Sequence, residues 1–278
     1  MCASLFVTPV AKTRSDRINQ IRELKSEKPS LINAYLTLME KKKLLNQLSN
    51  KLKKRRLLKK DGGLCAFTAM VDAFEAFSEY YKLARSKFIK RPDYFLYQII
   101  DEARNSMDAD PAYEGIELKD LVTYTSAVIE KYGLESIVQL NFINDPKEID
   151  PDKLNPDGSK IRLLGVTSKD GKEGHTMVML GIDTKKKVFF VSDPNYPNKV
   201  LTLKYRKLKK GLGIYLDKKD FPGFQPSYIE EIVEVSIHPE EPSQVIPGPD
   251  MPLPLTEGDD ISPNGPAAGG GPTQPSKQ

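Results

Sequence analysis

The chain has 278 residues, which is enough for one large domain with appendages or for two small ones. It has two cysteines, which argues against a disulfide scaffold, and two histidines, which leave little material for a zinc site. No metal or other cofactor is expected. No run of about 18 apolar residues occurs, so no membrane-spanning helix is expected. The first 15 residues have no charged segment ahead of their apolar patch, so no Sec signal peptide is predicted.

The net charge of +4 conceals two regions of opposite sign. Residues 12–60 carry 16 Lys/Arg and 4 Asp/Glu, a net charge of +12, which leaves −8 for the rest of the chain. Seven of the ten residues in 51–60 are basic. Such a run is either a solvated helix face or a contact for an acidic protein or an anionic membrane surface. No aromatic residues alternate with these charges, so specific nucleic-acid binding is not expected.

The first 60 residues are predicted to form a basic helical extension. Apolar spacing indicates one helix over 13–28 and, after Pro29, a second over 31–58. Leucines recur every seven residues from Leu24 to Leu52, but the intermediate positions are poorly apolar, so a coiled coil is disfavoured. A helical hairpin packed against the rest of the protein, or an arm that engages a partner, fits the pattern better.

Beyond residue 60 the pattern is helical first and β-rich afterwards. A helix is predicted from Cys65 to about residue 88, with two more over 93–107 and 117–132, followed by a loop over 141–160. This order predicts an α+β domain over 61–238. The last 40 residues, 239–278, contain 10 Pro and 6 Gly and are predicted to be disordered. The predicted strands span 161–167, 175–182, 187–193, 199–205, 212–216 and 228–237.

Cys65 is the first candidate functional residue. It follows Gly62 and Gly63 and stands where the next helix should begin. Unpaired backbone N–H groups and the positive end of the helix dipole favour a thiolate at that position, and the thiolate is the nucleophilic form of cysteine. On this stretch alone, a buried structural cysteine is an equally good interpretation.

His175 and Asp193 are the candidate partners of the thiol. The strands over 175–182 and 187–193 should form a hairpin centred near Lys185, which places His175 opposite Asn195 and Asp193 opposite Met177. The imidazole and the carboxylate would then be diagonal neighbours on one face of the sheet. In this arrangement Cys65 would be the nucleophile, His175 the base, and Asp193 the acid that orients the base. The other histidine, His238, borders the Pro-rich tail and is taken as incidental.

Three segments together resemble a known family. They are GGLCAFTAMV (62–71), GHTMVMLGID (174–183) and VFFVSDPNY (188–196), and they are similar to papain-like cysteine proteases of bacterial virulence, particularly the YopT/AvrPphB effectors. The resemblance covers residues 61–216. It implies a papain-like fold in which a helical lobe carrying Cys65 faces an antiparallel β-lobe carrying His175 and Asp193, with these three residues as a catalytic triad.

The resemblance implies a protease effector that hydrolyses an amide bond of a host protein. Such proteins are secreted without a Sec signal peptide and act in the host cytosol. A glutamine deamidase or a transglutaminase-like effector with the same triad is one alternative, and a non-enzymatic interaction protein that uses the basic helical arm is another. The sequence departs from the family in two ways. No Gln or Asn lies closer before Cys65 than Asn50 to serve the oxyanion, and no Trp follows Cys65.

Overall fold

The structure is a computed structural model. It describes residues 16, 18, 19, 21, 31–46, 63–80, 92–108, 110–136, 138–145, 147–154, 159–171, 173–208, 211–215 and 226–237. The basic run 51–60, the predicted tail 239–278 and most of the predicted helix 13–28 lie outside these residues. Within them, no helix has both the length and the apolar character needed to cross a membrane.

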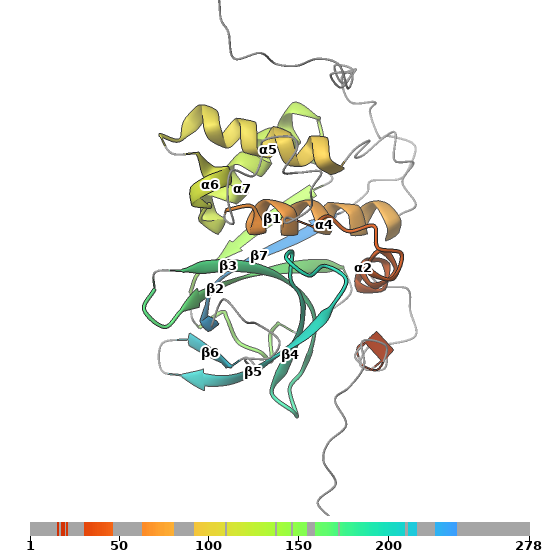
Figure 1. Ribbon diagram of the computed structural model, residues 1–278, viewed down its shortest axis with the longest axis vertical. Helices are drawn as coiled ribbons and strands as arrows, with labels where there is room; N and C mark the ends of the chain where they lie inside the picture. The colour runs from red at the N-terminus through yellow and green to blue at the C-terminus, as the bar shows by residue number, and fades with distance from the viewer. Residues whose placement is uncertain are drawn as a thin grey trace, which may run out of the picture. The chain divides into compact units, whose positions relative to one another are not determined.

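Helices precede strands along the chain, which confirms the predicted α+β class (Figure 1). The helices are α2 (Leu31–Glu40), α4 (Cys65–Tyr80), α5 (Pro92–Ser106), α6 (Pro111–Glu114) and α7 (Leu118–Lys131). The strands are β1 (Val138–Ile143), β2 (Lys160–Ser168), β3 (Gly174–Asp183), β4 (Val188–Ser192), β5 (Val200–Leu208), β6 (Gly211–Tyr215) and β7 (Pro226–Ile237). Each of the six predicted strands is present, with ends that move by a few residues.

The seven strands form one antiparallel sheet that closes on itself. Their order is β1-β7-β2-β3-β4-β5-β6, and β6 also pairs with β7, so β2 to β7 form a closed ring. The long strand β7 pairs with β2 along one edge. On its other edge, β6 pairs near the start of β7 and β1 pairs along its second half. The β6–β7 pairing covers part of the strand edges that an open sheet would leave exposed.

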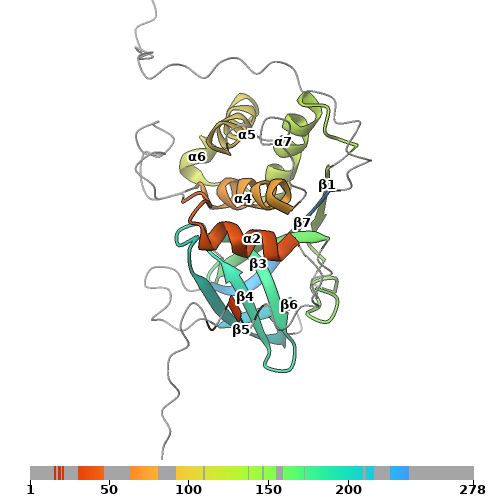
Figure 2. The ribbon, with the colours of Figure 1, turned by 90° about the vertical axis from the view of Figure 1, so that its right-hand side faces the viewer.

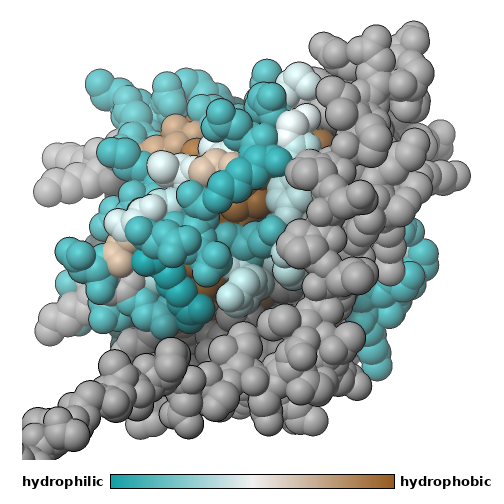
Figure 3. All heavy atoms as spheres, turned by 90° about the horizontal axis from the view of Figure 1, so that it is seen from above, coloured by the Kyte–Doolittle hydropathy of each residue, from teal (hydrophilic) through white to brown (hydrophobic). Residues whose placement is uncertain are grey.

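Two hydrophobic cores lie on the two sides of this sheet. One fills the inside of the barrel and includes Met177 and Met179 of β3. The other lies between the sheet and the helices and includes Val178 and Leu180 of the same strand. Because successive side chains of a strand point to opposite faces, residues 177–180 in the middle of β3 are apolar and buried on both sides of the sheet. The end of the molecule that carries α5 and α7 is mostly hydrophilic where it is described (Figure 3).

The predicted helix over 31–58 is wrong for residues 41–46, because α2 ends at Glu40, and its part over 47–58 lies outside the described residues. Lys42 adopts a positive φ of 54°, and the Lys43 N–H donates to the Leu38 carbonyl at 2.9 Å. The Lys42 N–H donates to the Met39 carbonyl at 3.1 Å, which completes a Schellman motif. The Leu45 N–H then donates to Asp72 Oδ1 at 2.8 Å and fixes the chain to α4.

α2 packs on α4 through an apolar face that buries Leu31, Tyr35 and Leu38 among others. Two of the leucines in the seven-residue repeat are therefore used inside this protein's own core. The predicted loop over 141–160 is also corrected, because residues 141–143 belong to β1. These three residues pair with Glu234, Val233 and Ile232 of β7, which places them in the sheet. The short helix α6 was not predicted.

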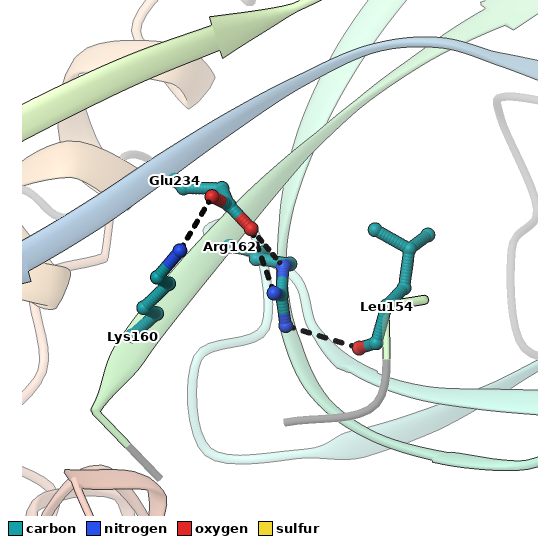
Figure 4. Close-up of polar contacts among 4 residues, drawn as sticks. All are labelled: Leu154, Lys160, Arg162 and Glu234. Carbon is teal, nitrogen blue, oxygen red and sulfur yellow. Dashed lines mark hydrogen bonds and ion pairs between the residues drawn. The ribbon is translucent and has the colours of Figure 1, made fainter. Parts of the chain in front are cut away.

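A buried ion-pair cluster closes the end of the barrel away from the site. Glu234 Oε1 accepts from Arg162 Nε at 2.7 Å, and Glu234 Oε2 accepts from Lys160 Nζ at 3.0 Å (Figure 4). Arg162 also donates to the Leu154 carbonyl at 3.0 Å. Ile149 and Leu154 lie in the inner core, so the cluster holds the loop over 147–154 across the barrel end.

We predict that Glu234→Gln lowers the free energy of unfolding by about 3–5 kcal/mol in urea titrations, because it leaves the buried guanidinium of Arg162 without its anionic partner. Burial acts to raise the pKa of Glu234, but Lys160 and Arg162 outweigh it and lower that pKa from 4.5. A lowered folded pKa gives stability that is present above pH 4.5 and lost as the pH falls through the folded pKa. The difference between the two proteins should therefore shrink in acid.

The matched control is Lys131→Gln, which breaks the exposed pair with Glu102 and should cost less than about 1 kcal/mol. Equal losses for the buried and exposed pairs would contradict the role given to Glu234.

Candidate functional site

Cys65 is the first residue of α4, as predicted. The turn before it depends on Gly63, which has a φ of +85° and lies against the corner after α6. A Cβ at Gly63 would lie 2.7 Å from the Ala112 carbonyl oxygen and 2.9 Å from the Gly115 nitrogen, both backbone atoms. Only glycine has both the conformational freedom and the space, so this contact fixes where the helix begins.

The β3–β4 hairpin determines which residues share a face with His175. Near the turn, Asp183 pairs with Val188 and Gly181 with Phe190. Beyond an extra residue in β3, Leu180, the pairing becomes Met179 with Val191 and Val178 with Ser192. Continued by one residue, this register sets Met177 opposite Asp193, which is the predicted alignment. The extra residue is a β-bulge.

Asp193 is held by the turn that follows β4. Its Oδ1 accepts the Asn195 N–H at 2.8 Å, and its backbone carbonyl accepts the Tyr196 N–H at 2.8 Å. The first contact is an Asx turn, and Pro194 supplies the fixed φ that suits the second position of a turn. The sequence Asp-Pro-Asn-Tyr thus holds one carboxylate oxygen in place through local hydrogen bonds.

His175 and Asp193 are in direct contact. His175 Nε2 lies 2.9 Å from Asp193 Oδ1. The Asp193 side chain is fully buried, and the His175 side chain is 9% exposed. With Nε2 engaged by the carboxylate, the ring nitrogen Nδ1 is left for the thiol. The carboxylate therefore fixes both the orientation of the imidazole and the nitrogen that it offers.

The Cys65 thiol lies within hydrogen-bonding reach of the His175 ring and of the backbone N–H groups of Thr176 and Ala66. Burial acts to raise the pKa of Cys65, but His175 and the two N–H groups outweigh it, and the pKa is lowered. Burial acts to lower the pKa of His175, whereas Cys65 and Asp193 raise it to about 10. Both shifts favour a thiolate–imidazolium pair, and the residue Cys65 is partly exposed.

All three residues selected from the sequence come together at the start of α4 and the adjoining ends of β3 and β4. The other histidine, His238, which was taken as incidental, lies outside the described residues. Sequence reasoning did not anticipate the Thr176 N–H as a donor to sulfur. The position of Thr176 next to His175 could have indicated this contact, because its backbone N–H lies close to the base and hence to the thiol. No local sequence pattern indicated that Tyr35 and Asp72 lie near the site.

We predict that Gly63→Ala destabilises the protein and slows alkylation of Cys65, because the clash displaces the start of α4. Gly133 provides the control, since it has a φ of +63° but open space around its Cα. Gly133→Ala should cost about 1–2 kcal/mol from backbone strain alone. Gly63→Ala should cost about 1–3 kcal/mol more in urea unfolding. Equal losses and unchanged alkylation would show that the contact does not position Cys65.

Comparisons with known proteins do not assign the chain to a family. No protein-family model matches the sequence, and no curated protein matches it. The geometry of the site is therefore the basis for the functional conclusion.

Proposed function

We propose that the protein is a papain-like cysteine protease in which Cys65 is the nucleophile, His175 is the general base and acid, and Asp193 orients the imidazole. One observation supports this most directly. A thiol at a helix start has a lowered pKa and contacts an imidazole whose other nitrogen is held by a buried carboxylate. A structural cysteine needs neither a charged partner nor an orienting acid.

The chemistry follows from these contacts. The Cys65 sulfur attacks an amide carbonyl carbon, forming a C–S bond while the carbonyl electron pair moves to oxygen. When the C–N bond breaks, the protonated His175 gives its proton to the leaving nitrogen. Water then attacks the thioester as His175 takes a proton, the C–S bond breaks, and a carboxylic acid and the thiolate leave. The backbone N–H of Cys65, at the start of α4, is one donor for the oxyanion.

The arrangement of the elements also supports the papain-like part of the proposal. The thiol comes from a helical region, and the imidazole and carboxylate come from an antiparallel sheet packed against it. With the sequence resemblance, this favours an effector protease that is secreted without a Sec signal and hydrolyses a host protein in the host cytosol. Deamidation of a glutamine side chain uses the same three groups and is an outcome that the experiments below distinguish.

We predict that Cys65 reacts with iodoacetamide far below the pH at which an ordinary thiol does. A Cys2→Ser variant leaves Cys65 as the single thiol, and N-acetylcysteine serves as the reference. An ordinary thiol loses about tenfold in rate for each pH unit below its pKa, so at pH 6 Cys65 should react at least about tenfold faster. The rates are measured by mass spectrometry of quenched samples.

His175→Ala in the same background removes the main cause of the lowered pKa of Cys65. Its alkylation profile should therefore move to higher pH. If Cys65 in the unaltered site reacts no faster than the reference thiol at pH 6, the proposed nucleophile is wrong. A non-enzymatic interaction protein would then be the better interpretation.

We predict a fixed order of damage when the three residues are replaced. Cys65→Ala and His175→Ala should each lower turnover by at least about 10³-fold, and Asp193→Asn should lower it less, because the imidazole keeps its place but loses its charge partner. The effects should not add, because the three act as a unit. Turnover is read in a host-cell lysate by mass spectrometry against the Cys65→Ala protein.

New peptide termini that depend on Cys65 indicate a protease, whereas a gain of about one dalton at glutamine indicates a deamidase. Activity that survives Cys65→Ala would contradict both reactions.

A further inference from the structure

The buried phenol of Tyr35 lies near α4, which carries Cys65, and near Asp193. Tyr35 is 1% exposed and belongs to α2, which lies along α4 on the side that faces the sheet (Figure 2). α4 carries Cys65, and β4 leads directly to Asp193. Tyr35 is thus a polar side chain from a third element, placed between the helix that supplies the nucleophile and the strand that supplies the carboxylate.

The Tyr35 hydroxyl is hydrogen-bonded to the side chain of Ser192, the residue immediately before Asp193. Ser192 is 1% exposed, and its Oγ donates to the Pro197 carbonyl at 3.5 Å across the turn. Burial raises the pKa of Tyr35 well above its usual value, and the nearby carboxyls of Asp72 and Asp193 raise it further. The phenol therefore keeps its proton and is a neutral donor close to both carboxyls.

Both of these carboxyls use one oxygen and leave the other without a partner. Asp193 Oδ1 accepts from His175 and from Asn195, and Asp72 Oδ1 accepts from the Leu45 N–H. Among the described residues, neither Asp193 Oδ2 nor Asp72 Oδ2 has a hydrogen-bond partner, although both are buried. A buried acceptor without a hydrogen-bond partner lowers the stability of the folded state. A neutral O–H dipole nearby therefore has a large effect on the orientation of these carboxyl groups.

We propose that Tyr35 is a positioning residue of the site: its hydroxyl, held by Ser192 and close to Asp72 of α4 and to Asp193, fixes the Asp193 carboxylate relative to the helix that carries Cys65. Through Asp193 it sets the imidazole against the sulfur. Tyr35 does not touch the reacting atoms, and its proposed role rests on the proposed function of Cys65 and His175.

The test is Tyr35→Phe, which keeps the ring and its packing and removes only the hydroxyl. It is made in the full chain with Cys2→Ser, and the pH dependence of Cys65 alkylation by iodoacetamide is measured. This readout needs no substrate, and a purely structural residue would not move it. We expect the profile to move to higher pH and the rate at pH 6 to fall by about fivefold, which corresponds to the net contribution of one neutral hydrogen bond.

Tyr132→Phe is the matched control, because Tyr132 directly follows α7 and its hydroxyl is hydrogen-bonded to Gln98 of α5. Its alkylation profile should equal that of the parent. Ser192→Ala removes the group that holds the Tyr35 hydroxyl, so it should shift the profile in the same direction. The double variant should shift it no further than the larger single effect. Ser192→Ala also keeps the test decisive if Tyr35→Phe does not fold.

The outcomes separate the two proposals. If the parent Cys65 is reactive at pH 6 and both folded variants keep its profile, the role of Tyr35 is wrong and the proposed function stands. If the parent itself has an ordinary thiol profile, the proposed function fails, and the role of Tyr35 fails with it. A shift in Tyr132→Phe equal to that in Tyr35→Phe would also overturn the inference, since any lost hydroxyl would then have the same effect.

Discussion

The contact between His175 and Asp193 depends on a single extra residue in β3. Without the bulge at Leu180, the pairing near the turn would continue unchanged and would set Asp193 opposite Val178. A shift of one residue moves every side chain of a strand to the other face, so the carboxylate would then lie on the opposite side of the sheet from the imidazole. The orientation of the His175 ring and its contact with Cys65 therefore require the bulge.

Much of the sheet and the three site residues were predictable from the sequence. The strands show because β-branched and aromatic runs end at turn residues, and Cys65 shows because two glycines interrupt a basic run before an apolar helix. The predicted alignment of Met177 with Asp193 was correct, although the reasoning behind it left out the bulge. A symmetric hairpin about Lys185 ignores the bulge, whereas the real turn lies half a residue later and the bulge restores the alignment. Gly181 beside Leu180 was the available signal, since an isolated glycine in a strand often marks a bulge.

The features that escaped prediction are those set by tertiary contacts. The end of α2 uses a lysine at a position where glycine is usual, so the sequence carries no stop signal at Lys42. Tyr35 has the apolar spacing of a core residue, and only the fold shows that its hydroxyl lies among buried carboxyls. Such placements depend on residues far away in the chain and leave no local pattern.

Because β7 pairs with β1, β2 and β6, the strand that comes last in the described chain organises much of the sheet. A nascent chain that has already produced Cys65, His175 and Asp193 still lacks the strand that closes the barrel beneath them. Pairings over such long sequence separations form late and slowly, since the entropy of closing large loops must be overcome first. During synthesis, therefore, the thiol exists well before the environment that favours its ionisation, and the completed site appears only after residue 237 has been added.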